Sequence, residues 1–379
     1  MRKEALWELK IDEEDRQICQ KVKANLDHIA KPLDGLGVLE GMLCTLGAVQ
    51  GSEIIRSGPR GLIVMCADNG IVAEGVSQSG QEVTLAVAQN LGNRRSTVCK
   101  MASRADLEVI PVDIGINTAQ KIPGVLDRKV RMGTRDFLKE PAMTEEEVLQ
   151  AIETGIDLVK DCWKRGLKIL ATGEMGIGNT TTSTAVAAAL LGLRIPQITG
   201  RGAGLSDQGL CRKIQVIEEG LEKYGFHRND RELLDAGTEH KEDGDQLADR
   251  TEQERAFRIL QCVGGLDIAG LCGVFIGGSM YHIPVVIDGV ISAAAALCAD
   301  RLVPGACRSM LASHAGAEPA MRYLLDALDL REVIHADLAL GEGTGAVMLF
   351  PLLDMALEVY HGSSSFDEIG VAQYERHNT

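Results

Sequence analysis

Residues 61–70 are GLIVMCADNG, a continuous apolar run that ends in polar residues and glycine. A short run of this kind is typical of a parallel strand that is buried on both faces of its sheet. The same pattern recurs in three other places, which are 107–112 (LEVIPV), 168–171 (KILA) and 284–287 (PVVI). The sequence therefore predicts a parallel sheet that contains these four strands.

Helical patterns lie between and around the predicted strands. Thr144-Glu145-Glu146-Glu147 has the form of a capping box, and apolar residues recur behind it at helical spacing. The same reasoning predicts helices over 180–191, 206–221 and 345–360, and a mainly helical stretch over 1–55. Strands that alternate with helices indicate an α/β fold of Rossmann-like, three-layer form, with a parallel sheet and helices on both faces.

The composition excludes several classes of protein. The chain has 379 residues, with 39 Lys and Arg against 54 Asp and Glu, so its formal charge is −15. Such an acidic chain, with only 3% aromatic residues, is a poor candidate for binding nucleic acid or an anionic membrane. No run approaches the roughly 18 apolar residues that span a bilayer. The ten cysteines form no C-x-x-C pair and lie mostly in apolar runs, which favours reduced, buried thiols and a cytoplasmic location.

Three glycine-rich segments share one design. They are 172–181 (TGEMGIGNTT), 200–206 (GRGAGLS) and 341–346 (GEGTGA), and each opens a predicted helix. Backbone N–H groups in such loops, together with a helix N-terminus, form an anion site. Three of them in one chain predict a phosphorylated ligand. There is no G-x-x-x-x-G-K-[ST] loop, and Gly176-Ile177-Gly178 lacks the third glycine of the dinucleotide fingerprint, which disfavours a nicotinamide dehydrogenase.

Two of these loops carry a glutamate, Glu174 and Glu342. A carboxylate among glycines at a strand end suits a general base or a ligand contact, although it could equally brace the loop or cap the helix. Lys213 and Arg201 flank one loop–helix unit and could meet a phosphate. The alternative for Lys213 is a surface lysine whose stem covers apolar side chains.

Other polar residues carry weaker signals. His314 could be an acid or base, but no nucleophile accompanies it, so a loop or core histidine is the default. Asp68 and Asp288 end strands and could bind a metal or sugar hydroxyls, yet no acidic pair indicates a magnesium–pyrophosphate site. The dense charge run at 226–256 has no apolar period and is predicted to be an exposed loop or insertion. A metal site at His227 and His240 within it is much less favoured than a solvated loop.

Motifs along nearly the whole chain resemble one known family, the nicotinate-nucleotide–dimethylbenzimidazole phosphoribosyltransferases of the cobamide (vitamin B12-type) pathway. Their order and spacing carry the resemblance, which no single glycine loop could. The matching segments are 31–40 (KPLDGLGVLE), 67–77 (ADNGIVAEGVS), 81–84 (QEVT), 173–181 (GEMGIGNTT), 200–204 (GRGAG), 286–289 (VIDG) and 340–346 (LGEGTGA).

The resemblance implies transfer of the 5-phosphoribosyl group from nicotinate mononucleotide to a nitrogen of 5,6-dimethylbenzimidazole. The products are α-ribazole 5′-phosphate and nicotinate, and neither a cofactor nor a metal is needed. It further implies a homodimer that acts on small-molecule substrates. Each chain would have a large α/β domain over 61–340 and a small helical domain built from 1–60 and 341–379.

The resemblance also implies a set of site residues. Glu342 matches the catalytic base and Glu174 the second site carboxylate. The phosphate and nucleotide would be held by a larger group, which comprises Gly176, Gly178, Asn179, Thr180, Arg201, Gly202, Gly204 and Lys213. Gln81 matches a residue beside the aromatic base, and we place Ser77 and Leu340 in the same base-binding pocket.

Two rival functions belong to other classes. One is a non-catalytic or accessory member of the family that binds base or nucleotide beside an active subunit. The presence of both Glu174 and Glu342 argues against it. The other is a nucleotide-dependent kinase, which would need a magnesium-binding acidic pair and an ATP loop, and neither is evident in the sequence.

The family often has an aromatic–proline pair before the glutamine, whereas Ser79-Gly80 precede Gln81 here. We therefore predict a roomier and less selective base pocket. Burying a methyl group is worth about 1 kcal/mol or less. Benzimidazole and dimethylbenzimidazole should then differ by less than roughly 100-fold in kcat/KM in a competition assay. A much steeper preference for one of them would contradict a roomy pocket.

Overall fold

The structure is a computed structural model that describes residues 1–13, 15–226 and 242–376. Within them a six-stranded sheet has the order β3-β2-β1-β4-β5-β6, and all its neighbouring strands are parallel. Its strands are β1 (Arg60–Ala67), β2 (Leu107–Gly115), β3 (Leu126–Asp127), β4 (Ile169–Met175), β5 (Val285–Ile287) and β6 (Met310–Ala312). A separate parallel pair joins β7 (His314–Gly316) to β8 (Ile334–Leu338).

The four predicted strands are confirmed, and they form the contiguous centre of the sheet, β2-β1-β4-β5. Four further strands, β3, β6, β7 and β8, were not predicted from the sequence. Three of these have only two or three residues, and β8 contains His335, Ala336 and Asp337, which are all exposed. Such segments lack the apolar run that marks a buried strand.

The predicted helices are also confirmed. The capping box of α6 is complete, because Glu147 N–H donates to Thr144 Oγ1 (3.2 Å) and Thr144 N–H donates to Glu147 Oε2 (2.7 Å). The α-helices are α1 (Lys3–Trp7), α2 (Arg16–His28), α3 (Val38–Gln50), α4 (Glu82–Gly92), α5 (Thr97–Arg104), α6 (Glu145–Lys164), α7 (Asn179–Leu191), α8 (Ile195–Ile198), α9 (Asp207–Tyr224), α11 (Glu242–Val263), α12 (Leu266–Met280), α13 (Val290–Leu302), α14 (Ala320–Ala327) and α15 (Thr344–Gly362). In the described part of the chain, two short 3-10 helices lie at Gly70–Glu74 and Ala306–Ser309. Among the described residues, no helix is both long enough and apolar enough to cross a membrane.

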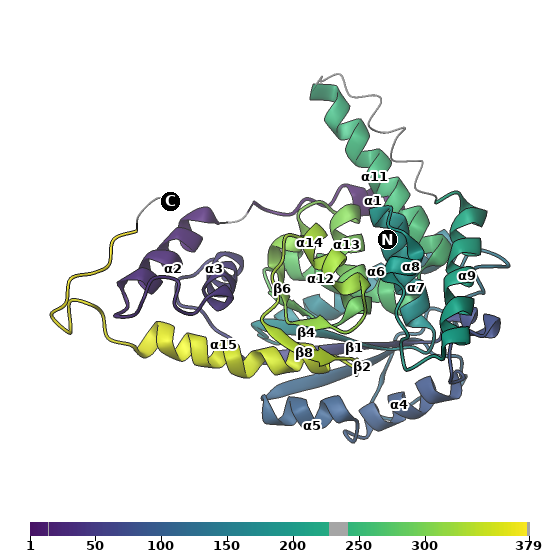
Figure 1. Ribbon diagram of the computed structural model, residues 1–379, viewed down its shortest axis with the longest axis horizontal. Helices are drawn as coiled ribbons and strands as arrows, with labels where there is room; N and C mark the ends of the chain where they lie inside the picture. Colours follow the sequence, from purple (N-terminus) through teal and green to yellow (C-terminus); the bar gives the residue numbers. More distant parts are fainter. Residues whose placement is uncertain (14, 227–241, 377–379) are drawn as a thin grey trace.

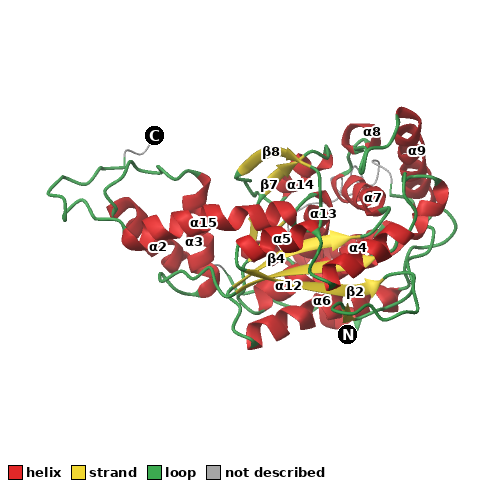
Figure 2. Cartoon of the chain, turned by 90° about the horizontal axis from the view of Figure 1, so that it is seen from below, coloured by secondary structure: helices red, strands yellow, loops and turns green. Residues whose placement is uncertain are grey.

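Helices cover both faces of the sheet, as the three-layer prediction requires (Figure 1). Successive side chains of a strand point to opposite faces of the sheet, so the side chains of β1 pack in two cores. Ile63 and Met65 pack in the core shared with α6, α12 and α13. Leu62 and Val64 pack on the other face, in the core shared with α4, α5 and α15. Figure 2 shows the arrows of β2 and β4 running the same way, so the carboxyl ends of the strands share one edge.

Helices from both chain ends gather beside the sheet, where α2, α3 and α15 lie together (Figure 1). An isolated bridge between Ile29 and Ser365 joins the two ends. Leu6 of α1 belongs instead to the core on the opposite face of the sheet. The predicted division into domains 61–340 and 1–60 with 341–379 stays a prediction.

The predicted exposed loop at 226–256 is wrong from residue 242 onward, where α11 begins. Gln253 and Ala256 of this helix are buried, at 6% and 1% exposure. The C-terminal half of α11 is anchored in the core by Phe257 and Leu260. Once a helix is anchored, extending it through polar residues costs little, so the missing apolar period was a poor guide. Residues 227–241, which include His227 and His240, lie outside the described residues.

Glycine allows α6 and α12 to touch backbone to backbone. A Cβ atom at Gly155 of α6 would lie 2.1 Å from Gly270 O and 2.7 Å from Val274 N on α12. Neither neighbour is a flexible side chain that could move away. The close crossing of these helices, which cover one face of β1, therefore depends on glycine at this position.

We expect Gly155→Ala to lower the free energy of unfolding by about 1–3 kcal/mol, because it overpacks two helix backbones. Gly41→Ala in α3 is the matched control, since a Cβ atom there has nothing within 4 Å. The better helix propensity of alanine should make that variant neutral or slightly more stable. Urea titration measures both, and equal stability of the two variants would contradict the packing argument.

Candidate active site

A cleft of about 300 Å³ lies at the carboxyl edge of the sheet. The ends of β4 and β8, the loops after β5 and β7, and the first turns of α7 and α13 line it. Seven of the predicted site residues line this cleft, namely Glu174, Gly176, Asn179, Thr180, Gly202, Leu340 and Glu342. The structure thus brings both predicted carboxylates and residues from all three glycine-rich segments to one cavity.

Glu342 lies in the tight loop that starts α15. Its φ is +60°, a conformation that non-glycine residues rarely adopt, and it stands between two glycines with positive φ. Burial raises the pKa of its carboxyl, whereas hydrogen bonds from the Val98 N–H and the Ser96 hydroxyl at the start of α5 partly oppose this. Its Oε2 atom is buried and has no hydrogen-bond partner among the described residues. One oxygen of Glu342 is therefore left without a donor from the described part of the chain.

Asp288, which follows β5, holds that loop in place. Its Oδ2 accepts a hydrogen bond from Gly343 N–H (3.1 Å), and its Oδ1 accepts one from Ala346 N–H (2.9 Å). The side chain is only 2% exposed. Asp288 thus caps the N-terminus of α15 and links β5 to Glu342. This structural role explains why Asp288, which the sequence offered as a candidate for binding a metal or sugar hydroxyls, is a carboxylate.

Glu174 is part of a buried network of carboxylates and an amide. Asn179 Nδ2 donates to both Glu174 Oε2 and Asp267 Oδ2, the latter at 3.1 Å. Burial, reinforced by the negative charge of Asp267, raises the pKa of Glu174 to about 8. Burial also raises the pKa of Asp267 to about 6. At neutral pH Glu174 therefore holds a proton in the ligand-free chain.

Lys213 lies beneath the cleft rather than in its lining. Its side chain is fully buried, and Nζ donates to Thr180 Oγ1 and to Gly200 O, both at 3.0 Å. Burial lowers the pKa of Lys213 to about 8. The lysine therefore ties the start of α7 to the 200–204 loop, and it is no surface lysine.

Other predicted residues lie outside the lining. Arg201 is half exposed and pairs with Asp207 at 2.5 Å. Gln81 donates from Nε2 to Asn69 O (3.3 Å), and its Oε1 accepts from Asn117 Nδ2 (2.9 Å). The remaining predicted residues that do not line the cleft are Ser77, Gly178 and Gly204, together with Lys213.

The cleft region also contains three residues that were not predicted as site residues from the sequence. Asp267 lies in the first turn of α12, which is buried from Leu266 to Ser279, and its only sequence signal was a lone acid in an apolar stretch. Glu318 lines the cleft and accepts a hydrogen bond from Gly202 N–H at 2.8 Å. His314 is buried, as a core histidine would be, yet it also lines the cleft and lies 2.9 Å from Ser313 Oγ through Nδ1.

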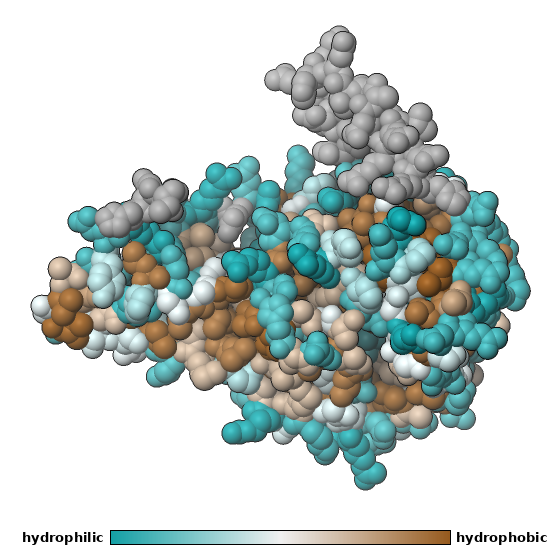
Figure 3. Space-filling view, in the orientation of Figure 1, coloured by the Kyte–Doolittle hydropathy of each residue, from teal (hydrophilic) through white to brown (hydrophobic). Residues whose placement is uncertain are grey.

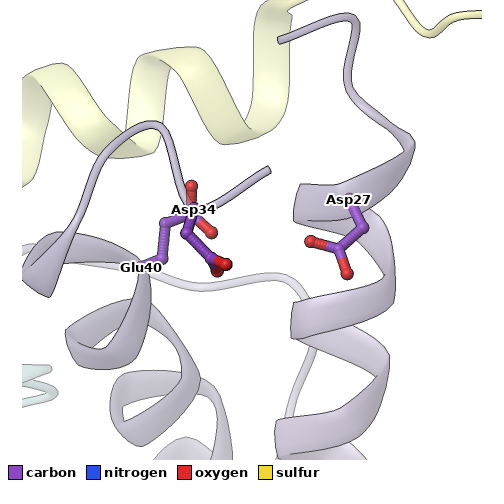
Figure 4. A group of neighbouring side chains, drawn as sticks. All are labelled: Asp27, Asp34 and Glu40. Atoms are coloured by element: carbon purple, nitrogen blue, oxygen red, sulfur yellow. The ribbon is translucent and has the colours of Figure 1, made fainter. Parts of the chain in front are cut away.

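One group of carboxylates among the described residues has metal-ligand spacing. One oxygen each of Asp27, Asp34 and Glu40 lies within 4.8 Å of the others. Figure 4 shows the three side chains, which come from α2, the loop before α3 and the first turn of α3. Cations of the chain already pair with all three. Glu40 binds Lys23 (2.7 Å) and Lys31 (2.6 Å), while Arg376 binds Asp27 and Asp34, the closest atoms being 2.7 and 2.8 Å apart. This group is a network of ion pairs.

Comparison with known proteins identifies relatives along nearly the whole chain. A family model described as phosphoribosyltransferase matches residues 11–371. The nicotinate-nucleotide–dimethylbenzimidazole phosphoribosyltransferase of Ruminiclostridium cellulolyticum is 38% identical over 367 residues, with 96% of this chain and 97% of the relative covered. The enzyme of that name from Clostridium acetobutylicum is 36% identical over 363 residues, covering 95% and 96%. The crystal structure of CobT from Thermus thermophilus matches with a TM-score of 0.81 and 34% identity, over 94% of this chain and 100% of that one.

We expect Asp288→Ala to lower the free energy of unfolding by about 1–3 kcal/mol, because two N–H groups at the start of α15 lose a buried acceptor. Glu358→Ala, an exposed change on the same helix, should stay within about 0.5 kcal/mol of the parent. Denaturant titration measures both variants. If Asp288→Ala were as stable as the control, the capping role would be refuted.

Proposed function

The chain belongs to the nicotinate-nucleotide–dimethylbenzimidazole phosphoribosyltransferase family, and on that premise we propose how its cleft performs the transfer. It is a phosphoribosyltransferase, and its donor is nicotinate mononucleotide, with dimethylbenzimidazole or a related base as acceptor. The product, α-ribazole 5′-phosphate, serves cobamide biosynthesis. The anomeric carbon inverts as the acceptor nitrogen displaces nicotinate from the opposite face.

The observation that carries the proposal is the position of Glu342. It lines the cleft on a capped loop and keeps one buried oxygen without a donor among the described residues. The acceptor must lose its ring N–H proton as its other nitrogen attacks the ribose, and this oxygen is suited to accept that proton. Burial raises the pKa of Glu342, which makes the carboxylate a stronger base. The leaving pyridine needs no acid, because the donor pyridinium departs as a neutral ring.

In this proposal Glu174 stabilises positive charge on the donor. The pyridinium ring is cationic, and positive charge develops on the ribose as the glycosidic bond breaks. A carboxylate in a buried cleft stabilises such charge more strongly than it could in water. Asn179, which hydrogen-bonds both Glu174 and Asp267, fixes the orientation of Glu174. We assign Glu174 to electrostatic stabilisation and Glu342 to general-base catalysis.

Backbone amides of the glycine loops are assigned to the 5′-phosphate. Gly176 and Gly178 belong to the loop that opens α7, Thr180 lies in the first turn of that helix, and Gly202 and Gly204 belong to the second loop. Lys213 supports both loops from below and adds positive charge, and Arg201 stands at the outer side of the second loop. Leu340, Gln81 and Ser77 are assigned to the acceptor base, with Leu340 on the cleft side.

We further propose a homodimer in the cytoplasm. Met348 and Met355 lie seven residues apart on α15 and are 38% and 58% exposed, and Leu340 nearby is 53% exposed. Figure 3 shows apolar surface gathered over the region of α15. A second copy would cover this surface. All ten cysteines lie within the described residues and are free, which suits a reducing compartment.

The direct test is nicotinate release from nicotinate mononucleotide and dimethylbenzimidazole in the presence of EDTA. We expect the parent chain to form α-ribazole 5′-phosphate, whereas Glu342→Gln should lower kcat about 10²–10⁴-fold because it removes the base but keeps the size of the side chain. Glu358→Gln is the control and should retain full activity. Absence of activity in the parent would favour the non-catalytic alternative. A Glu342→Gln enzyme with more than about a tenth of parental kcat would refute general-base catalysis by this residue.

Donor binding should release a proton from Glu174. Its pKa of about 8 keeps it protonated at pH 7, and a bound pyridinium favours the ionised form. Lys213, whose pKa is also about 8, is already mostly charged at pH 7 and takes up little. Calorimetry at pH 7 in buffers of different ionisation enthalpy should detect release of close to one proton in the parent and almost none in Glu174→Gln. Equal proton release by both proteins would exclude Glu174 as the source.

A further inference from the structure

Glu318 extends from the connection between β7 and α14 into the second glycine loop. Its Oε1 accepts the hydrogen bond of Gly202 N–H at 2.8 Å. Gly202 and Ala203 line the same cleft as Glu318. An amide in the loop assigned to phosphate is thus already bound to an anion of the protein itself.

The carboxylate is seated deep against this loop. A Cβ atom at Gly200 would lie 2.0 Å from Glu318 Oε2 and 2.6 Å from Oε1. Any side chain at this position would therefore collide with the carboxylate, and glycine permits the close approach. Both carboxylate oxygens of Glu318 therefore lie in close contact with the loop.

The charge of the loop is balanced by the same carboxylate. Lys213 Nζ donates to Gly200 O on the buried side of the loop, and the negative charge of Glu318 favours the charged form of this lysine. The loop therefore has a buried cation behind it and a carboxylate in front. These are the electrostatic features of an anion site that is occupied.

We propose that Glu318 is an internal competitor for the 5′-phosphate, occupying the Gly200–Gly202 loop in the ligand-free enzyme and leaving it when the donor binds. The inference rests on the proposed function, because it takes phosphate as the ligand of this loop. A phosphate and a carboxylate cannot share one amide and one buried lysine without strong repulsion. Part of the binding energy of the phosphate is therefore used to displace Glu318, so the carboxylate sets the affinity of the loop for anions.

The consequence is that every ligand that places a phosphate on this loop must first supply the free energy that displaces Glu318. Inorganic phosphate must displace Glu318 with the contacts of the phosphate alone. Nicotinate mononucleotide adds the contacts of its ribose and pyridinium ring in the rest of the cleft. Glu318 thus lowers the affinity for free phosphate and for the donor by a similar factor, and the further contacts of the donor keep its binding the stronger of the two.

The test is to measure Kd for inorganic phosphate by calorimetry and KM and kcat for nicotinate mononucleotide in the parent, Glu318→Gln and Glu318→Ala. Glutamine keeps an acceptor for Gly202 N–H but removes the charge. A charged hydrogen bond is worth about 1 kcal/mol more than a neutral one, so phosphate should bind about 5- to 10-fold tighter to Glu318→Gln. KM for the donor should fall by a similar factor, with little change in kcat. Glu318→Ala should also bind phosphate more tightly than the parent.

Asp326→Asn is the matched control, because it removes one charge from the exposed side of α14 without touching the loop, and it should leave both constants unchanged. Unchanged or weaker phosphate binding in both Glu318 variants would overturn the inference. Unchanged phosphate binding with a raised KM for the donor is the result expected if Glu318 held the ribose hydroxyls. Lys213→Met distinguishes the phosphate assignment of the loop from the competitor role of Glu318. If it weakens phosphate binding while Glu318→Gln has no effect, the phosphate assignment stands and the competitor role fails. If neither variant changes phosphate binding, both assignments fail.

Discussion

The parallel sheet is buried on both faces, and this constraint shapes the rest of the molecule. Side chains of β1 enter one core with α12 and another with α15, so neither face can carry polar groups. Because all six strands run the same way, their carboxyl ends meet at one edge. Polar residues that follow β4, β5 and β8 are thereby concentrated in a single cleft. This geometry brings Glu174 and Glu342 together, although they lie far apart along the chain.

Four acidic side chains are gathered in or beside this cleft, and nearby hydrogen-bond donors stabilise several of them. Glu174, Asp267, Asp288 and Glu342 lie near one another in an environment that penalises charge. Asp288 is stabilised by two backbone N–H groups, and Asn179 bridges Glu174 and Asp267. Burial keeps a proton on Glu174 in the ligand-free chain. The pyridinium ring of a bound donor would favour loss of this proton, because it stabilises the ionised carboxylate.

Charges are also balanced at the second glycine loop, which we propose as part of the phosphate site. Lys213 is buried behind the second glycine loop, and Glu318 covers its front. Neither the lysine nor the Gly202 amide is left as a free positive group. Cations and anions are likewise paired in the Asp27, Asp34 and Glu40 group. There Arg376, near the end of the chain, forms ion pairs with Asp27 of α2 and with Asp34 in the loop before α3. Ion pairing therefore joins distant segments beside the sheet, as charge balance does in the cleft.

Much of the fold was determined by local sequence. Continuous apolar runs such as 61–66 predict buried strands, and the capping residues around Thr144 predict where α6 begins, because these signals depend only on neighbours along the chain. The family motifs likewise pointed to Glu174 and Glu342. Short strands such as β3 and the polar half of α11 could not be predicted, since their pairing and anchoring partners are remote in sequence. Only the tertiary structure decided that Lys213 is buried, that Asp288 caps α15 and that Glu318 lies on Gly200, because each role is set by contacts between segments that the chain brings together only when it folds.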